Sequence, residues 1–438
     1  MAGAGVPPQP RRDRRTPTMA RTRGLNGLVA AADRLLPDGD VVVALGGGAD
    51  SATAALVTVR AGRRVLGVFV AHATASTSLL GEATRRLADR LGIEHLEVPA
   101  PVDAGGDLER RLREARRAAL REVAAGRPIV LGHTADDQAE TVLLHLFRGA
   151  GVRGLAGMRR ADPPWYRPLL DLSRAEARRL AEAAELPFVD DPMNDDPRFS
   201  RNRLRRRLLP IVEGEVGPVT GVLAATADRL AEVDRHLAAA ADAVPLRRDA
   251  GALLLPAPVL VAVEPAVAAY AVWRALLGHL GPQGGTAADV AAVLEVARDG
   301  GRRQLGGGFL AEREGPHVAI HRGGPERPEG EVELPVPGRC AFGPFTVAAE
   351  PGPRGRFAPP PGPLRLRVPR PGDRIAIREG RKTVADALAE AGVPRRLRGA
   401  WPVVVAGSSI VAIPGVRLAP QVATRPGSGL ELTIERRP

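Results

Sequence analysis

The stretch VVVALGGGADS at residues 41–51 decides the fold of this chain. Residues 41–45 are uniformly apolar, which is typical of a parallel strand covered on both faces. Three glycines at 46–48 follow directly, and Asp50 and Ser51 stand where the next helix would begin. Glycines allow the backbone to approach a phosphate closely, and a helix N-terminus favours an anion. The stretch therefore predicts a phosphate-binding loop between a strand and a helix.

Two well-known types of nucleotide loop are excluded at this position. A Walker loop requires a lysine after its last glycine, and Ala52 and Thr53 follow Ser51 instead. The dinucleotide fingerprint does not match either. The alternative is a tight strand-to-helix connection that binds nothing, so the rest of the chain has to distinguish the two.

Length and charge point to a multidomain protein with a polyanionic partner. The chain has 438 residues and a formal net charge of +12, and its basic residues are almost wholly arginine. Arginine suits phosphate recognition because its planar fork donates two hydrogen bonds. The alternative is a general arginine bias that affects every surface. The first 24 residues, rich in proline and arginine, are predicted to be a disordered basic leader.

Cysteine usage and hydropathy indicate the compartment. Cys340 is the single cysteine of the sequence, which excludes a disulfide framework and a cysteine-based zinc site. No apolar run is long enough to span a bilayer. We expect a cytoplasmic protein with no membrane partner.

From residue 25 onward, short apolar runs alternate with helical patterns, which indicates an α/β fold with a parallel sheet. Strands are predicted at 41–45, 65–70, 95–98 and 129–132, and helices at 51–60, 81–91, 108–124 and 135–148. Ligands of such sheets bind beyond the carboxyl ends of the strands. We therefore expect the 46–51 loop, the region of His72 and residues 133–137 to converge on one crevice.

Composition shifts divide the chain into four further parts. The α/β domain is expected at 25–212, a mainly helical domain at 213–325, a Pro/Gly-rich connector with short strands at 326–363, and a small α+β domain at 364–438.

The densest polar cluster, GHTADDQAET at 132–141, follows a predicted strand and opens a helix. Asp137, Glu140 and Thr141 share one face of that helix because they are three and four residues apart. Carboxylates there could bind an ammonium group or Mg²⁺. The alternative is a capped helix whose acidic first turn only complements the helix dipole.

These motifs together resemble the tRNA(Ile)-lysidine synthetases, a family of the PP-loop ATP pyrophosphatase group with the signature S-G-G-x-D-S. Residues 46–51 match that signature at five of six places. The similarity extends to the blocks at 132–141, 148–158, 167–174, 190–210, 370–374 and 392–404.

Four positions depart from the family pattern. Gly46 replaces a serine, Ala73 replaces the glycine that usually follows His72, Arg117 replaces a tyrosine, and Met193 replaces a serine. Gly46 removes one hydroxyl contact to a phosphate, although a backbone N–H could still serve.

The resemblance implies a Rossmann-like PP-loop domain, a helical tRNA-binding domain and a C-terminal tRNA-binding domain. It also implies a ligase that forms a carbon–nitrogen bond in two steps. ATP, with Mg²⁺, adenylates C2 of the wobble cytidine of tRNA(Ile) with a CAU anticodon, and free L-lysine then displaces AMP to give lysidine, which switches decoding from AUG to AUA. Whether the protein is a homodimer is left open.

The resemblance assigns roles to individual residues. ATP would contact Gly46, Gly47, Gly48, Ala49, Asp50 and Ser51. The catalytic residues would be Asp50, Arg113, His133 and Asp137, with Asp50 also the ligand of Mg²⁺. Asp137 and Glu140 would bind lysine. The tRNA phosphates would contact Arg201, Arg203, Arg205, Arg206 and Arg207, for which a solvated basic surface is the alternative.

Two other functions remain as alternatives. A tRNA thiolase of the same group typically needs catalytic cysteines, and this chain has only Cys340. A catalytically weakened tRNA-binding protein would be consistent with Gly46 and Met193.

Overall fold

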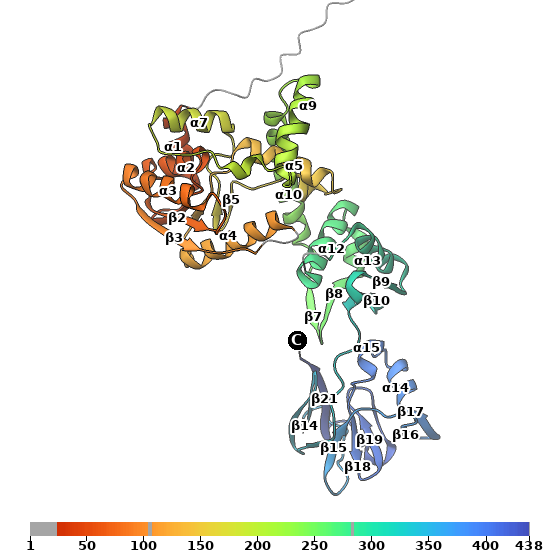
Figure 1. Ribbon diagram of the computed structural model, residues 1–438. Coiled ribbons are helices and arrows are strands. Elements are labelled where there is room, and N and C mark those ends of the chain that lie inside the picture. Colours follow the sequence, from red (N-terminus) through yellow and green to blue (C-terminus); the bar gives the residue numbers. More distant parts are fainter. Residues whose placement is uncertain (1–23, 104–106, 282–283, 438) are drawn as a thin grey trace, which may run out of the picture. The chain divides into compact units, whose positions relative to one another are not determined.

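The computed structural model describes residues 24–103, 107–281 and 284–437 of the chain. It contains two compact units, residues 1–235 and 236–438, which are taken in turn below (Figure 1). The leader expected at 1–24 lies, except for Gly24, outside the described residues. Within the described ranges no single helix is long and apolar enough to cross a bilayer. One pair of helical segments, Ser200–Val216 and Thr220–Ala241, has the length and composition of a span when taken together, but it is bent by 96°.

A six-stranded sheet forms the centre of the first unit, in the order β3-β2-β1-β4-β6-β5. Every neighbouring pair is parallel except β5 and β6. The strands are β1 (Asp40–Ala44), β2 (Arg64–Ala71), β3 (Glu94–Pro99), β4 (Ile129–Val130), β5 (Ala161–Asp162) and β6 (Trp165–Tyr166). The chain moves outward from β1 to β3 and then returns to β4 on the other side of β1. The order therefore reverses between β1 and β4, where ligands of open α/β sheets bind.

Helices cover both faces of this sheet, as β1 demonstrates residue by residue. Val41 and Val43 pack in one apolar cluster with residues of α1 (Leu25–Leu35), α2 (Ala49–Arg60) and α7 (Arg174–Ala183). Val42 points to the other face and joins a cluster with Leu120 of α4 (Leu108–Ala124). A strand buried on both faces needs no alternation of polar and apolar residues, which explains the uniform run at 41–45.

The remaining helices of the first unit connect the strands or follow the sheet (Figure 1). They are α3 (Thr77–Leu91), α5 (Ala135–Leu146), α6 (Val152–Leu155), the 3₁₀ turn η1 (Pro192–Asp195), α8 (Ser200–Arg203), the π-helical turn η2 (Leu204–Leu208), α9 (Leu209–Val216) and α10 (Thr220–Ala241). The predicted α/β class and the four predicted strands are confirmed, and α4 has the predicted bounds.

The second unit begins with an antiparallel sheet in the order β7-β8-β11-β10-β9, packed against three helices. Its elements are β7 (Arg247–Asp249), β8 (Ala252–Pro256), α11 (Ala257–Ala262), α12 (Pro265–Leu280), α13 (Ala287–Asp299), β9 (Arg302–Gln304), the turn η3 (Gly306–Gly308), β10 (Leu310–Glu314) and β11 (His317–His321). The part expected to be mainly helical thus also contains five short strands, whose length gives little period-2 signal.

The rest of the second unit consists of small antiparallel sheets with two helices. Its elements are β12 (Val332–Leu334), β13 (Gly338–Phe342), β14 (Phe345–Pro351), β15 (Leu364–Arg367), β16 (Arg374–Ile377), β17 (Gly380–Thr383), α14 (Val384–Glu390), α15 (Arg395–Arg398), β18 (Val403–Ala406), β19 (Ser409–Ile413), β20 (Arg417–Leu418), the turn η4 (Pro420–Val422) and β21 (Leu430–Arg436). Strand β12 pairs with β15, and β14 pairs with β21. The segment expected to be a connector is therefore part of the C-terminal sheets.

Candidate active site

The glycine loop between β1 and α2 is held by its own hydrogen bonds. The backbone N–H of Gly46 donates to Ser51 Oγ at 3.1 Å, and Ser51 Oγ donates to the carbonyl of Gly48 at 2.9 Å. Among the residues that the structure describes, no side chain caps the N-terminus of α2. The first amides of this helix are therefore free to face an anion, as the sequence predicts for a phosphate loop.

Gly47 is the loop position that requires glycine. Its φ is +79°, and a Cβ added there would lie 2.8 Å from Leu80 Cδ2 and 3.2 Å from Leu80 Cα. Gly46 has an ordinary φ, and a Cβ there would meet nothing closer than Ser51 Oγ at 3.9 Å. The departure at Gly46 therefore leaves space for the serine that the family usually has.

This contrast gives a matched pair of variants. Gly47→Ala is expected to destabilise the first unit by about 3 kcal/mol, because left-handed strain and overpacking against Leu80 add together. Gly46→Ser should keep wild-type stability and turn over at least as fast as the wild type. Urea denaturation and ATP turnover of both variants would check this, and equal losses at the two positions would contradict the loop geometry described above.

The loop and the polar cluster meet at the switch point of the sheet. A Cβ at Gly132 would lie 2.7 Å from the carbonyl oxygen of Asp50, so only glycine lets the end of β4 approach α2 this closely. Gly46, Asp50, His72, His133 and Asp137 all line one crevice of about 510 Å³. The convergence expected from the strand order is thus present.

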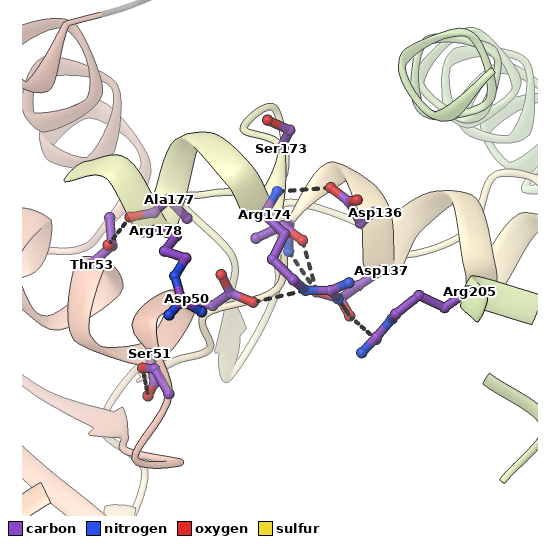
Figure 2. Close-up of polar contacts among 12 residues, drawn as sticks. Asp50, Ser51, Thr53, Asp136, Asp137, Ser173, Arg174, Ala177, Arg178 and Arg205 are labelled. Carbon is purple, nitrogen blue, oxygen red and sulfur yellow. Dashed lines mark hydrogen bonds and ion pairs between the residues drawn. The ribbon is translucent and has the colours of Figure 1, made fainter. Parts of the chain in front are cut away.

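Three carboxylates surround Arg174, which lines this crevice, and Figure 2 shows Arg174 between Asp50 and Asp137. Its Nε lies 3.3 Å from Asp50 Oδ2, its Nη2 lies 2.9 Å from Asp137 Oδ1, and its Nη1 lies 3.7 Å from Glu140 Oε1. A second arginine, Arg205, places its Nε 2.7 Å from the same oxygen of Glu140. Both carboxylates assigned to lysine are therefore already paired with guanidinium groups.

The start of α7 is capped locally and is tethered to two neighbouring helices. Ser173 and Glu176 form a capping box, with Ser173 N–H donating to Glu176 Oε2 at 2.9 Å. The N–H of Arg174 donates to Asp136 Oδ2 at 2.8 Å, and Thr53 Oγ1 of α2 donates to the carbonyl of Ala177 at 2.8 Å (Figure 2). These bonds fix the start of α7 against both α5 and α2.

Comparison with known proteins settles the family. A family model described as a PP-loop domain matches residues 20–212, and one described as the TilS substrate C-terminal domain matches 364–433. A tRNA(Ile)-lysidine synthase of Thermus thermophilus is 35% identical over 403 residues, covering 87% of this chain and 70% of that protein. One of Nocardia farcinica is 38% identical over 294 residues, covering 64% of this chain and 92% of that protein. The chain belongs to the tRNA(Ile)-lysidine synthase family.

In this member of the tRNA(Ile)-lysidine synthase family, burial and arginines set the charge of the site. Burial raises the pKa of Asp50 to about 6, against the opposing effect of Arg174. Burial would also raise the pKa of Asp137, but the charge of Arg174 and the Thr134 N–H together lower it below its usual value. Asp137 is therefore the more firmly ionised of the two carboxylates.

His133 is held as a neutral imidazole. Burial lowers its pKa, and the charges of Arg167 and nearby arginines act in the same direction against Asp137. Arg167 Nε donates to His133 Nδ1 at 3.3 Å, so the proton of the neutral ring belongs on Nε2. His133 can therefore donate a hydrogen bond without carrying a charge.

Asp50 is the residue of the crevice that could bind Mg²⁺. Its Oδ1 is buried and has no hydrogen-bond partner in the described structure, so this oxygen is available to coordinate a hard cation. Within the described residues no group of three or more His, Cys, Asp or Glu side chains is arranged to hold a metal. One carboxylate suits Mg²⁺, which commonly keeps several waters and takes its other ligands from substrate phosphates.

The other residues assigned from the sequence lie in different surroundings. Arg113, Arg201 and Arg205 line the crevice. Arg203 instead donates to the carbonyls of Pro197 and Arg198 at 2.8 and 2.9 Å. Arg206 and Arg207 are exposed on the turn η2.

Of the other departures from the family pattern, Met193 is accommodated, whereas Ala73 has a left-handed φ of +57°, which favours the glycine of the family. Met193 lines the crevice, and its N–H donates to Asp191 Oδ1 at 2.9 Å, so the turn that usually contains serine is still capped by Asp191. His72 Nδ1 donates to the carbonyl of Ala100 at 2.9 Å, and its buried Nε2 has no partner within the described residues.

Two functional arginines were missed in the sequence, Arg174 and Arg167. Arg174 closes the quoted block at 167–174 and follows the capping serine Ser173, so its place at the first turn of a helix was the available signal. Nothing in its local sequence indicates that Asp50, 124 residues away, is its partner.

Proposed function

We propose that this chain joins lysine to C2 of the wobble cytidine of a tRNA(Ile) with a CAU anticodon, by way of an adenylated tRNA. The observation that carries the proposal is the meeting of the glycine loop with Asp137 in one crevice. The buried Glu140 lies behind Asp137, within 3.7 Å of the same Arg174. Family membership supports the same activity. Such a ligation needs a loop that binds ATP and carboxylates that bind the ammonium groups of lysine.

In the first step, the C2 oxygen of cytidine attacks the α-phosphorus of ATP and pyrophosphate leaves. The amides of residues 46–51 would hold the leaving phosphates, and Asp50 would hold Mg²⁺, which neutralises charge on them. Arg113 and the Nε2–H of neutral His133 would donate to the α-phosphate oxygens as charge shifts there.

In the second step, the ε-amine of lysine attacks C2 and AMP leaves. The amine must first lose a proton, and AMP departs with the former C2 oxygen. Asp137 and Glu140 would bind the ammonium groups of lysine, taking over part of the bonding now given by Arg174 and Arg205. Exchange of one cation for another keeps these buried carboxylates paired throughout.

The test is incubation of the purified protein with ATP, lysine and a CAU-anticodon tRNA transcript. We expect tRNA-dependent release of AMP and pyrophosphate, and lysidine in the nuclease digest by mass spectrometry. A transcript with a GAU anticodon serves as the control and should give neither product. Absence of AMP release would sink the synthetase proposal and favour a weakened tRNA-binding protein.

AMP release without lysidine would point to another modification by the same adenylation. A thiolase reaction is disfavoured because it typically uses catalytic cysteines, and Cys340 is the single cysteine of the sequence. We also propose a cytoplasmic location. The subunit number stays open and would be read from the mass in solution.

A further inference from the structure

A second cavity of about 630 Å³ adjoins the crevice in the first unit. It lies among α4, the end of α5, α6 and the start of α8. Eight arginines and three acidic residues line it, so its wall is strongly basic. Five of the lining residues also line the crevice, namely Glu109, Arg113, Arg117, Arg167 and Arg201. The two cavities therefore share a wall.

Some of these arginines are neutralised within the protein and others are not. Arg110 pairs with Asp107 at 2.7 Å, and Arg159 pairs with Asp234. Arg113, Arg117 and Arg148 form no ion pair with any residue in the described part of the chain. Three guanidinium groups are thus available to an anionic ligand on one cavity wall.

The shared wall carries an excess of positive charge. Reduced hydration lowers the pKa of Arg113, although the residue is exposed, and the charges of Arg201, Arg117 and Arg116 lower it further against Glu109. Burial lowers the pKa of Arg167 to about 10; Asp162 opposes this, and Arg117 and Arg113 add to it. Arginines that repel one another in this way are stabilised when a polyanion binds between them.

The guanidinium of Arg117 stacks on the ring of Trp165. Its guanidinium carbon lies 4.4 Å from the centre of the Trp165 ring, and Trp165 itself is only 1% exposed. The tryptophan is therefore a buried support and not a platform for a base. A guanidinium stacked on one side in this way can stack a nucleobase on the other.

We propose that this second cavity binds the single-stranded RNA that flanks the target base, with a phosphate against Arg148 and a flanking base on Arg117. The inference rests on the proposed function, since it concerns the same RNA substrate. It extends the tRNA contact surface from the arginines at 201–207 to α4 and α5. A strand whose target base enters the crevice must continue past the shared wall, and the basic cavity lies there.

The test uses the full chain and a fluorescently labelled anticodon stem–loop hairpin, with affinity measured by anisotropy over a range of salt concentrations. Arg148→Ala should weaken hairpin binding by about 5-fold and reduce the salt slope by about one, because one phosphate contact is lost. Arg60→Ala is the matched control: Arg60 is exposed at the end of α2 and lines neither cavity, so we expect wild-type binding.

Arg117 is tested by shape as well as charge. Arg117→Leu should lose about 10-fold in hairpin affinity, whereas Arg117→Tyr should recover most of it, since a stacked base is retained. The KM for ATP should stay unchanged in Arg148→Ala. Thermal melting of each variant separates misfolding from lost contacts.

The outcomes separate this inference from the proposed function. Wild-type lysidine formation combined with unchanged hairpin binding by Arg148→Ala and Arg117→Leu would overturn the inference alone. Weaker hairpin binding by these variants supports the RNA cavity even if the wild type forms no lysidine. A raised KM for ATP with unchanged hairpin binding would assign the cavity to nucleotide and not to RNA.

Discussion

Replacing Asp50 by asparagine is expected to reduce tRNA-dependent AMP release by at least about 100-fold, because the buried carboxylate proposed to hold Mg²⁺ becomes neutral. The same change should leave the fold intact or stabilise it. Burial raises the pKa of Asp50 to about 6 from 3.8, so the ionised carboxylate is unfavourable in the folded protein. An amide of the same shape removes that cost. AMP release and thermal melting without ligands are the two measurements.

The pH dependence of stability gives a second check on Asp50. A carboxyl with a raised pKa weakens the fold as pH rises from its unfolded to its folded value. The stability of Asp50→Asn relative to the wild type should therefore grow from about pH 4 to about pH 6 and then stay constant. Asp38→Asn is the control, because the Asp38 side chain is 99% exposed. Equal loss of AMP formation and tRNA binding in Asp50→Asn would make Asp50 a structural residue.

Replacing Arg174 by methionine is expected to have the second large effect, on both stability and activity. Its guanidinium contacts Asp50, Asp137 and Glu140, and the Glu140 side chain is fully buried. Removing one partner of a buried ionic group leaves uncompensated charge, so we expect a loss of about 3 kcal/mol. The melting temperature should fall by roughly 5–10 °C, and AMP release should fall by at least about 100-fold.

A double-mutant cycle identifies the source of the Arg174 effect. Asp50→Asn introduced into Arg174→Met should restore part of the lost stability, because one of the unpaired carboxylates is then neutral. Arg174→Lys keeps the charge without the planar fork, so its stability should lie between those of the wild type and Arg174→Met. Wild-type stability of Arg174→Met would show that these ion pairs contribute nothing to the fold.

The sequence predicted the first unit well because its signals are local. Uniform apolar runs at 41–45 and 129–132 mark strands buried on both faces, and the pattern over 108–124 predicted α4 within its actual bounds. The convergence of the glycine loop with Asp137 followed from strand order alone. In the second unit the sequence indicated a hairpin at 302–321 and short strands in the Pro/Gly-rich stretch, and β10 pairs with β11 in that hairpin. The short strands gave too little signal to show how they assemble into sheets.

The charge states of the site depend on contacts that no local pattern encodes. Asp137 and Glu140 share a helix face as predicted, but their pairing with Arg174 and Arg205 joins residues 37 and 65 positions apart. The neutral state of His133 results first from its burial and then from the charge of Arg167, 34 residues away. Residue type and spacing indicated which groups would be present, and tertiary packing decides which of them carry charge.

The two tethers of α7 to its neighbours also decide what can move during turnover. The N–H of Arg174 is bound to Asp136, and the carbonyl of Ala177 is bound from α2, so the helix cannot shift without breaking both hydrogen bonds. The guanidinium of Arg174 is attached only through rotatable side-chain bonds. Release of the carboxylates therefore requires rotamer changes and no displacement of backbone, and such changes are faster than the microsecond-to-millisecond motions of whole elements. Exchange of ligands at this centre would consequently not limit the rate of a turnover cycle.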